Sequence, residues 1–303
     1  MRLWINIILL LLLTFALFTD AEARVNKKAD FIESVLTAKL EAVRKVLLET
    51  RDTYIKILNS DSIKPVYDFS IYEKNKPEDV FTDHNHVSKS VFYISHKTII
   101  TKDIINFIKK TEHLEDLFAN NLEMLPDLGW QFIYEYQNRS MRLYPWFNAQ
   151  NIMGNDINWD EVEIINKGRG IKSINDMVCS SPTMDFAGLG VIVTCAVPIF
   201  SNNKLYGLVG SDIQINETFE SSNQYLGNSL NEFSFIVSAK RGLILLKPIY
   251  YEYFFNNTSS IKDLDCNDKK HICRLNNQDY TYNFIEIRSK YLKQIRLMNL
   301  TKI

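Results

Sequence analysis

The sequence predicts an α+β fold, in which a long N-terminal helix precedes two antiparallel sheets. Three observations support this prediction. From Asp30 to Leu58, apolar residues recur mostly at three- and four-residue steps, which is the period of an amphipathic helix. From Gly129 onward, short strand-forming runs alternate with turns. A second and smaller set of such runs follows Asn216 and predicts a second sheet.

The first residues have the features of a secretory signal peptide. Arg2 supplies the positive start, residues 3–18 form an apolar run, and Ala21-Glu22-Ala23 matches a small-x-small cleavage site. The run is short for a membrane-spanning helix, which needs about 20 residues, so an uncleaved anchor is the alternative. We therefore expect residues 1–23 to be removed and the mature chain to lie outside the cell or on the extracellular or periplasmic side of a membrane.

Two helices are expected before the strands begin. The first covers residues 30–58 and contains neither Pro nor Gly. Residues 60–90 are polar, contain Pro65 and Pro77, and predict a loop with little regular structure. Thr101 is the expected N-cap of the second helix. The apolar face of this helix consists of Ile104, Ile105, Ile108, Leu114, Leu117 and Phe118.

The first sheet is expected to consist mainly of hairpins. Residues 130–136 and 141–144 are predicted strands that flank a turn at residues 137–140. Residues 148–175 predict a polar excursion with one or two short helices. Further strands are expected near residues 177–180, 191–198 and 205–213, with a tight turn at residues 201–204 between the last two.

The second sheet is predicted from fewer runs. Residues 219–230 predict a short helix, and residues 233–238 and 243–246 flank a hairpin turn in which Gly242 is free to adopt a positive φ. Residues 280–287 and 291–298 predict two more strands. The expected organisation is a signal peptide at 1–23, the long helix and first lobe at 24–216, and at 217–303 a smaller lobe that the chain end could leave incomplete.

Charge and cysteine content narrow the function. The chain has 35 basic and 36 acidic residues, which gives no electrostatic reason to bind nucleic acid. In an exported protein the four cysteines favour disulfides. Cys266 and Cys273 enclose a short polar loop and are expected to pair. A hairpin centred near Ala187 would place Cys179 opposite Cys195, the alternative being two buried free thiols.

Other motifs lead to weaker expectations. No Cys/His spacing resembles a zinc site, and His84-x-His86 lies in a polar loop, where a solvated pair is expected rather than a metal site. Five glycosylation sequons matter if the source is eukaryotic. They begin at Asn138, Asn216, Asn256, Asn257 and Asn299.

The order of the strand runs resembles the core of double Cache domains, an extracellular sensor family. The runs are Leu143-Tyr144-Pro145-Trp146, then residues 185–194, 196–200 and 206–213. The resemblance implies PAS-like lobes, a membrane-distal one packed on the long helix and a smaller membrane-proximal one. It also implies a sensor that binds a small organic ligand.

In amino-acid-binding Cache members, an Arg-x-Trp-Tyr segment, a Tyr-x-Asp segment and an Asp on the last strand line the distal pocket. The Arg binds the ligand carboxylate, and the acidic residues bind the ammonium group. Here Thr183-x-Asp185 stands where Tyr-x-Asp is expected, and Asp212 stands at the last-strand position. Trp159 is the tryptophan in the remaining region, without the Arg two residues before it.

The resemblance therefore implies a site formed by Asp185, Asp212 and Thr183, with Trp159 and Tyr144 as aromatic walls. Two carboxylates without a matching Arg favour a cationic or amine-bearing ligand over a free amino acid. Structural roles are the alternatives, because Asp in a Gly-containing turn commonly caps backbone amides and aromatic residues commonly belong to a core.

No catalytic motif is present, since the chain lacks Gly-x-Ser-x-Gly, His-Glu-x-x-His and a phosphate loop. We therefore expect a non-enzymatic sensor module without a cofactor and without an output domain in this chain. It would signal through a membrane receptor or channel partner or through a missing C-terminal region. The alternative is an auxiliary subunit related to calcium-channel alpha-2-delta proteins, without their von Willebrand A domain.

Overall fold

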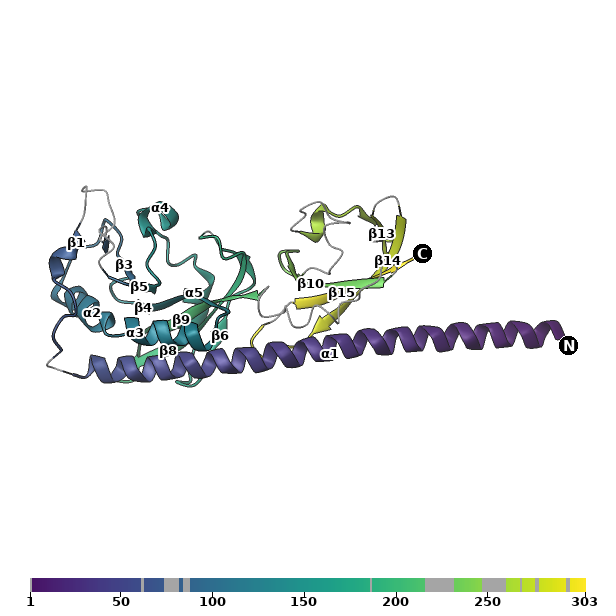
Figure 1. The fold of residues 1–303 in the computed structure, drawn as a ribbon, viewed down its shortest axis with the longest axis horizontal. Helices are drawn as coiled ribbons and strands as arrows, with labels where there is room; N and C mark the ends of the chain where they lie inside the picture. The colour runs from purple at the N-terminus through teal and green to yellow at the C-terminus, as the bar shows by residue number, and fades with distance from the viewer. Residues whose placement is uncertain are drawn as a thin grey trace. The chain divides into compact units, whose positions relative to one another are not determined.

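The computed structural model describes residues 2–60, 63–73, 82–83, 88–185, 187–215, 232–246, 260–267, 269–275, 278–292 and 295–303. The chain divides into two compact units (Figure 1). The large unit contains Lys39–Thr218, and the small unit contains Met1–Ala38 and Phe219–Ile303. Each unit has an antiparallel sheet of its own, which confirms the predicted α+β class.

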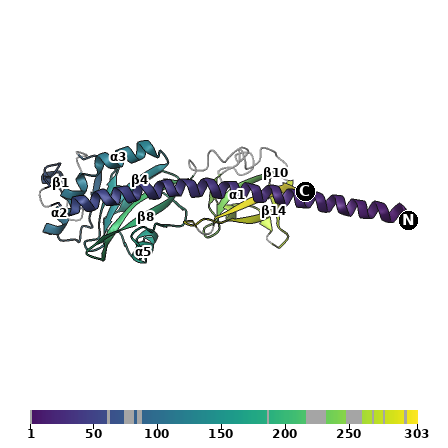
Figure 2. The same ribbon diagram turned by 90° about the horizontal axis from the view of Figure 1, so that it is seen from below.

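Helix α1 runs from Arg2 to Leu58, a length of 57 residues. It begins well before the predicted start because the apolar run at residues 3–18 also lacks helix-breaking residues. Its stretch in the large unit lies across one face of the sheet (Figure 2), and its buried apolar residues there include Leu40, Val43 and Leu47. Within the part of the chain that the structure describes, no helix has both the length and the hydropathy of a membrane span.

The predicted second helix is in fact two. Helix α2 covers Lys102–Glu112, with Thr101 Oγ1 accepting a hydrogen bond from the Ile104 backbone N–H as predicted. Helix α3 covers Glu115–Met124. The break follows Thr111, whose hydroxyl donates to the carbonyl oxygens of Phe107 and Ile108. Such back-bonding competes with the helical ladder and bends helices.

The sheet of the large unit has the strand order β3-β5-β4-β9-β8-β6, with β7 pairing to β8. Its central hairpins agree with the predicted strands, and Asn202 and Asn203 adopt the positive φ values of a tight turn between β8 and β9. The prediction missed β3, which begins directly after the region expected to be a loop. The strands are β3 (Val91–Tyr93), β4 (Leu128–Glu135), β5 (Ser140–Tyr144), β6 (Val178–Cys179), β7 (Thr183–Met184), β8 (Val191–Ser201) and β9 (Lys204–Gln214).

The two faces of this sheet pack against different elements. One face, here called the excursion face, packs against the segment between β5 and β6, which contains α4 (Ala149–Met153) and α5 (Glu163–Arg169). The other, the helix face, packs against α1, α2 and α3. Asn121 of α3 marks it, because its side chain donates to Thr50 of α1 and to Gln131 of β4. Ahead of β3, residues 69–71 form a 3-10 helix, followed by the short pair β1 (Tyr72–Glu73) and β2 (Thr82–Asp83).

The small unit contains a sheet in the order β11-β10-β15-β14-β13-β12. The predicted strand at residues 291–298 begins later, because Ser289 Oγ accepts hydrogen bonds from the backbone of Tyr291 and Leu292 and so prolongs the turn. The helix predicted at residues 219–230 lies outside the described residues. The strands are β10 (Glu232–Ser238), β11 (Ile244–Leu246), β12 (Cys266–Asn267), β13 (Ile272–Leu275), β14 (Gln278–Ile287) and β15 (Ile295–Lys302).

Both predicted disulfides are present. Cys266 and Cys273 are bonded and lie opposite each other on β12 and β13. Cys179 and Cys195 are bonded and lie opposite each other on β6 and β8. The second pair follows from the hairpin register that the sequence predicts around Ala187, and the alternative of free thiols is excluded.

Candidate ligand-binding site

Asp212 and Thr194 face each other on the two 11-residue strands of the large sheet. Thr194 lies opposite Asp212 in the β8–β9 ladder, and its hydroxyl donates to Asp212 Oδ1 at 2.5 Å. Residues two apart on a strand share a face. Both side chains therefore lie on the excursion face, with Ala196 and Leu208 of its apolar core.

Asp185 closes the turn between β7 and β8. Its backbone N–H donates to the carbonyl of Gly190 at 2.8 Å, and its carboxylate accepts from the Leu189 N–H at 2.9 Å. Trp130 Nε1 lies 3.5 Å from the same carboxylate oxygen, Oδ2. Gly188 and Gly190 have φ values of 99° and 80°, which this turn requires and which glycine adopts without strain. Asp185 thus caps a backbone amide, the structural role that the sequence left open.

The turn and the sheet together shield Asp212 from water. A Cβ at Gly129 would lie 2.4 Å from Leu189 Cδ1 and 3.6 Å from the Asp212 Cβ, so the Leu189 side chain reaches over β4 beside Asp212. A Cβ at Gly210 would lie 2.2 Å from Phe132 Cζ, so that ring rests directly on Gly210. Apolar groups therefore flank the Asp212 carboxyl, which is half-buried.

This setting changes the acidity of Asp212. Desolvation raises its pKa from 3.8 to about 7, the negative charge of Asp185 adds to the rise, and the hydrogen bond from Thr194 opposes it. Among the described residues, no Lys or Arg forms an ion pair with either carboxylate. The pair is thus an electronegative position beside an apolar core, and a ligand ammonium group would stabilise its ionised form.

Trp159 lies deeper on the excursion face. It is 3% exposed, and its ring centroid lies 5.0 Å from that of Tyr134 and 5.8 Å from that of Tyr93. Its indole Nε1 and the Tyr134 hydroxyl are buried and have no hydrogen-bond partner among the described residues. Buried donors of this kind usually have a partner. Trp159 is therefore part of the core and carries a donor that a ligand could use.

The structure separates Tyr144 from the acidic pair. Tyr144 packs against Phe118 of α3, with ring centroids 5.8 Å apart, and so lies on the helix face. The sequence predicts it as a wall of the same cavity, but the strand alternation of β5 turns Leu143 to the excursion face instead. Thr183 pairs with Ile192 and shares the face of Asp185, two residues along the chain.

A second buried charged group lies on the helix face. Arg142 is 0% exposed, and its guanidinium donates to Thr111 Oγ1 at 2.7 Å and to Ser90 Oγ at 2.6 Å. It also donates to the Ile108 carbonyl and the Tyr72 hydroxyl, and it lies 3.5 Å from the Glu115 carboxylate. We call this set the Arg142 network, with Glu112, which accepts from the Tyr72 hydroxyl at 3.0 Å.

Two contributors to the acidic site were missed from the sequence. Thr194 is a polar residue within the apolar run of residues 191–200. A polar side chain at a position of the strand that faces the core could have indicated its role. Trp130 packs against the core of the excursion face, and its indole Nε1 also lies 3.5 Å from the Asp185 carboxylate. No local sequence pattern predicts the Arg142 network or the position of Leu189 beside Asp212, because each joins residues far apart in the chain.

The remaining predicted sites are placed as follows. Asn138 lies in the β4–β5 turn, and its side chain donates to Glu135 at 2.7 Å. Asn299 is 6% exposed and accepts from Ser234 at 2.6 Å, so the folded unit leaves no room for a glycan there. His84, His86, Asn216, Asn256 and Asn257 lie outside the described residues. Across the described ranges, no cluster of three His, Cys, Asp or Glu side chains could hold a metal ion.

No protein-family model matches the sequence, and neither does any curated protein. Three of the similar solved structures are chemoreceptor ligand-binding domains. That of the Pseudomonas aeruginosa PAO1 amino acid chemoreceptor PctB with L-Arg has 14% identity and a TM-score of 0.41, and the match covers 63% of this chain and 79% of that chain. That of PctC from the same organism with GABA has 18% identity and a TM-score of 0.37, covering 62% and 81%.

The third is the ligand-binding domain of the Pseudomonas fluorescens chemoreceptor CtaA with L-isoleucine. It has 14% identity and a TM-score of 0.38, and the match covers 62% of this chain and 75% of that chain. All three are ligand-binding domains of chemoreceptors.

Proposed function

We propose that this chain is an extracellular small-molecule sensor module of Cache type, which binds an amine-bearing ligand at Asp212 and Asp185. One observation carries the proposal: Asp212 is a desolvated carboxyl on the core-facing side of the large sheet, without a cationic partner among the described residues. A desolvated charge without a partner is costly. An ammonium group would supply the missing cation and gain charge-assisted hydrogen bonds of about 1.5–3 kcal/mol each.

The signal would be a shift between conformations. A ligand that binds one conformation more tightly shifts the population toward it. The element best suited to respond is the turn of Asp185 and Leu189, because it contacts both the acidic pair and the start of β4. Helix α1 contributes residues to both units, so it is a continuous element through which a change could pass to a partner.

The proposed setting is outside the cell. The signal-peptide features at residues 1–23 and the two disulfides support export to an oxidising compartment. The output would come from a membrane receptor or channel partner, or from a C-terminal region beyond this chain. N-terminal sequencing of secreted material tests the first part, and a protein that still begins at Met1 would contradict cleavage.

The binding test uses the secreted, disulfide-bonded chain. Native mass spectrometry asks which small molecule co-purifies, and thermal-shift screening with amino acids, GABA and simple amines selects a ligand for calorimetry at pH 8. We expect Asp212→Asn to weaken binding at least about tenfold, the low end of the hydrogen-bond range above. Asp176→Asn is the matched control, because Asp176 is exposed on the same unit.

Protons should compete with the ligand at this site. Because the pKa of Asp212 is about 7 without a ligand, affinity should fall as pH is lowered from 8 to 6. The dependence should disappear in Asp212→Asn. Unchanged affinity in both Asp185→Asn and Asp212→Asn would show that the ligand binds elsewhere and that the two carboxyls are structural.

A further inference from the structure

Two adjoining cavities lie at the other end of the large sheet, where the β4–β5 and β8–β9 turns are. A wide cleft of about 520 Å³ is lined by residues of both turns, and a narrow pocket of about 160 Å³ is lined by α2 and the ends of α1 and β4. Gln137 and Tyr206 line both. Tyr206 is six residues from Asp212 on β9, which corresponds to roughly 20 Å along a strand. These cavities are therefore separate from the acidic pair.

The narrow pocket is electronegative. Glu135 lines it and is 2% exposed, yet no Lys or Arg among the described residues forms an ion pair with it. Its Oε2 accepts from Asn138 and Ser140 at 2.7 and 3.3 Å. Burial raises its pKa, and the nearby charge of Asp103, which also lines the pocket, adds to the rise.

The same pocket already holds one ammonium group of the protein. Lys110 Nζ donates to the backbone carbonyl of Leu58, the last residue of α1. That carbonyl belongs to the negative end of the helix dipole, which favours cations. The pocket thus contains a group that binds an ammonium ion, the Leu58 carbonyl. Glu135 forms no ion pair with a Lys or Arg among the described residues.

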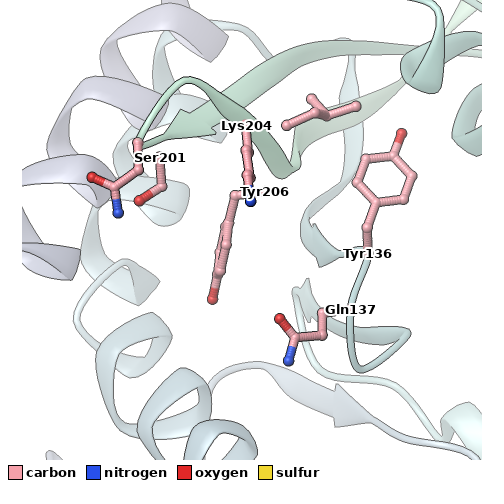
Figure 3. Close-up of a pocket in the computed structure, with 7 residues that line it drawn as sticks. Tyr136, Gln137, Ser201, Lys204 and Tyr206 are labelled. Carbon is pink, nitrogen blue, oxygen red and sulfur yellow. The ribbon is translucent and has the colours of Figure 1, made fainter.

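The wide cleft has a mixed lining of polar and apolar side chains (Figure 3). Tyr136 donates from its hydroxyl to the Ile165 carbonyl at 2.9 Å and has the Arg169 guanidinium 5.6 Å from its ring centroid. In Figure 3, Tyr206 projects into the open space between Ser201 and the Tyr136–Gln137 pair. Aromatic rings, an amide and a hydroxyl here suit a hydroxyl-bearing ligand, whereas Lys204 in the same cleft disfavours a second positive charge.

We propose that the two cavities form a second binding site, for a small ligand with one primary ammonium group and a hydroxyl-rich body, such as an amino sugar. The ammonium group enters the narrow pocket toward Glu135 and Asp103. The body lies in the wide cleft against Tyr136, Gln137 and Ser201. The site does not depend on the acidic pair proposed above.

Glucosamine is the probe, titrated by calorimetry and by chemical-shift mapping into the secreted, disulfide-bonded chain. We expect saturable binding, weakened at least about fivefold by Asp103→Asn, whose side chain is exposed and outside the core. Glu135→Gln should weaken it at least about tenfold and Tyr206→Trp should also weaken it by filling the cleft. Asp212→Asn should leave it unchanged, which separates this site from the first.

Two related compounds test the charge argument. Glucose lacks the ammonium group, and putrescine carries two ammonium groups but no hydroxyl-rich body, so both should bind at least about tenfold more weakly than glucosamine. The proposal is overturned if glucosamine shows no saturable binding, if glucose binds equally well, or if Asp103→Asn and Tyr206→Trp both bind like the wild type.

Discussion

Two groups of acidic residues lie on opposite faces of the same sheet, one of them buried and the other half-buried, and they differ in their partners. On the helix face, Glu112 and Glu115 share the Arg142 network, in which each charge has partners. On the excursion face, Asp212 and Asp185 have hydrogen bonds but no cation among the described residues. A fully satisfied buried network rigidifies the fold, whereas the missing cation beside Asp212 is the feature on which the proposed ligand site rests.

The comparison also predicts opposite effects on stability. Removing one member of a complete buried network leaves an uncompensated charge and destabilises the fold. Neutralising a carboxyl that has no cation removes a desolvation cost instead. The four predictions below run from the largest expected effect to the smallest, and those at Arg142, Asp212 and Thr194 test this contrast.

Arg142→Met should destabilise the large unit by about 3–5 kcal/mol, because Glu115 and Glu112 would stay buried without their cation. Urea unfolding of the secreted chain measures the loss. Arg169→Met is the control, since Arg169 pairs with Asp160 at the surface and should cost less than about 1 kcal/mol. Equal effects of the two substitutions would show that the network is not needed for stability.

Replacing both Cys179 and Cys195 by Ser should cost about 3 kcal/mol on the loop-entropy estimate, because the bond closes a sequence separation of 16. The matched change at Cys266 and Cys273, with a separation of 7, should cost about 2.3 kcal/mol. Thermal unfolding of the two variants shows which disulfide contributes more to stability. The first change should also weaken ligand binding, because Cys195 directly follows Thr194 on β8.

Asp212→Asn should stabilise the protein at pH 8 by at most a few kcal/mol. The folded-state pKa of about 7 lies above the ordinary value of 3.8, so the unfolded chain releases its proton first as pH rises. The ionised Asp therefore lowers stability progressively between about pH 4 and pH 7, and Asn has no such cost. Unfolding curves at pH 4 and pH 8 test the sign, and a destabilised variant at pH 8 would contradict the contrast.

Thr194→Val should have the smallest effect, about 1 kcal/mol, through the loss of one hydrogen bond. That bond lowers the pKa of Asp212, so its removal should raise the pKa further. Carbon-detected NMR titration of the Asp212 carboxyl measures the shift. Ser180→Ala is a useful control, because its hydroxyl accepts from the Thr194 backbone N–H and does not touch Asp212.

Local patterns were sufficient to predict most of the fold. The helical period of α1, the cap at Thr101 and the hairpins around residues 137–140 and 201–204 are all encoded by neighbouring residues. The break between α2 and α3 was missed because Thr111 has no special propensity in sequence. Its hydroxyl donates back to the carbonyl oxygens of Phe107 and Ile108, and it also accepts from Arg142, a residue far away in the sequence.

The site was predictable only in part. Asp185 and Asp212 were placed near each other through the resemblance to Cache domains, and the structure brings both to the excursion face. Tyr144 was assigned to the wrong face because a residue's side of a strand depends on the register of the whole sheet. Glu135, the centre of the second proposed site, had no signal at all, since its burial arises from the packing of α2 and the turn at Asn138.

Because helix α1 is uninterrupted, its buried apolar residues form one continuous stripe along the helix. Ile32 and Leu36 are buried in the part that belongs to the small unit, and Leu40, Val43 and Leu47 continue the same stripe in the part that belongs to the large unit. One residue inserted after Ala38 would turn the second half of the stripe by about 100° relative to the first, whereas seven would return it to within about 20°. Insertions that keep the apolar stripe of α1 continuous should therefore have lengths close to whole numbers of helical turns.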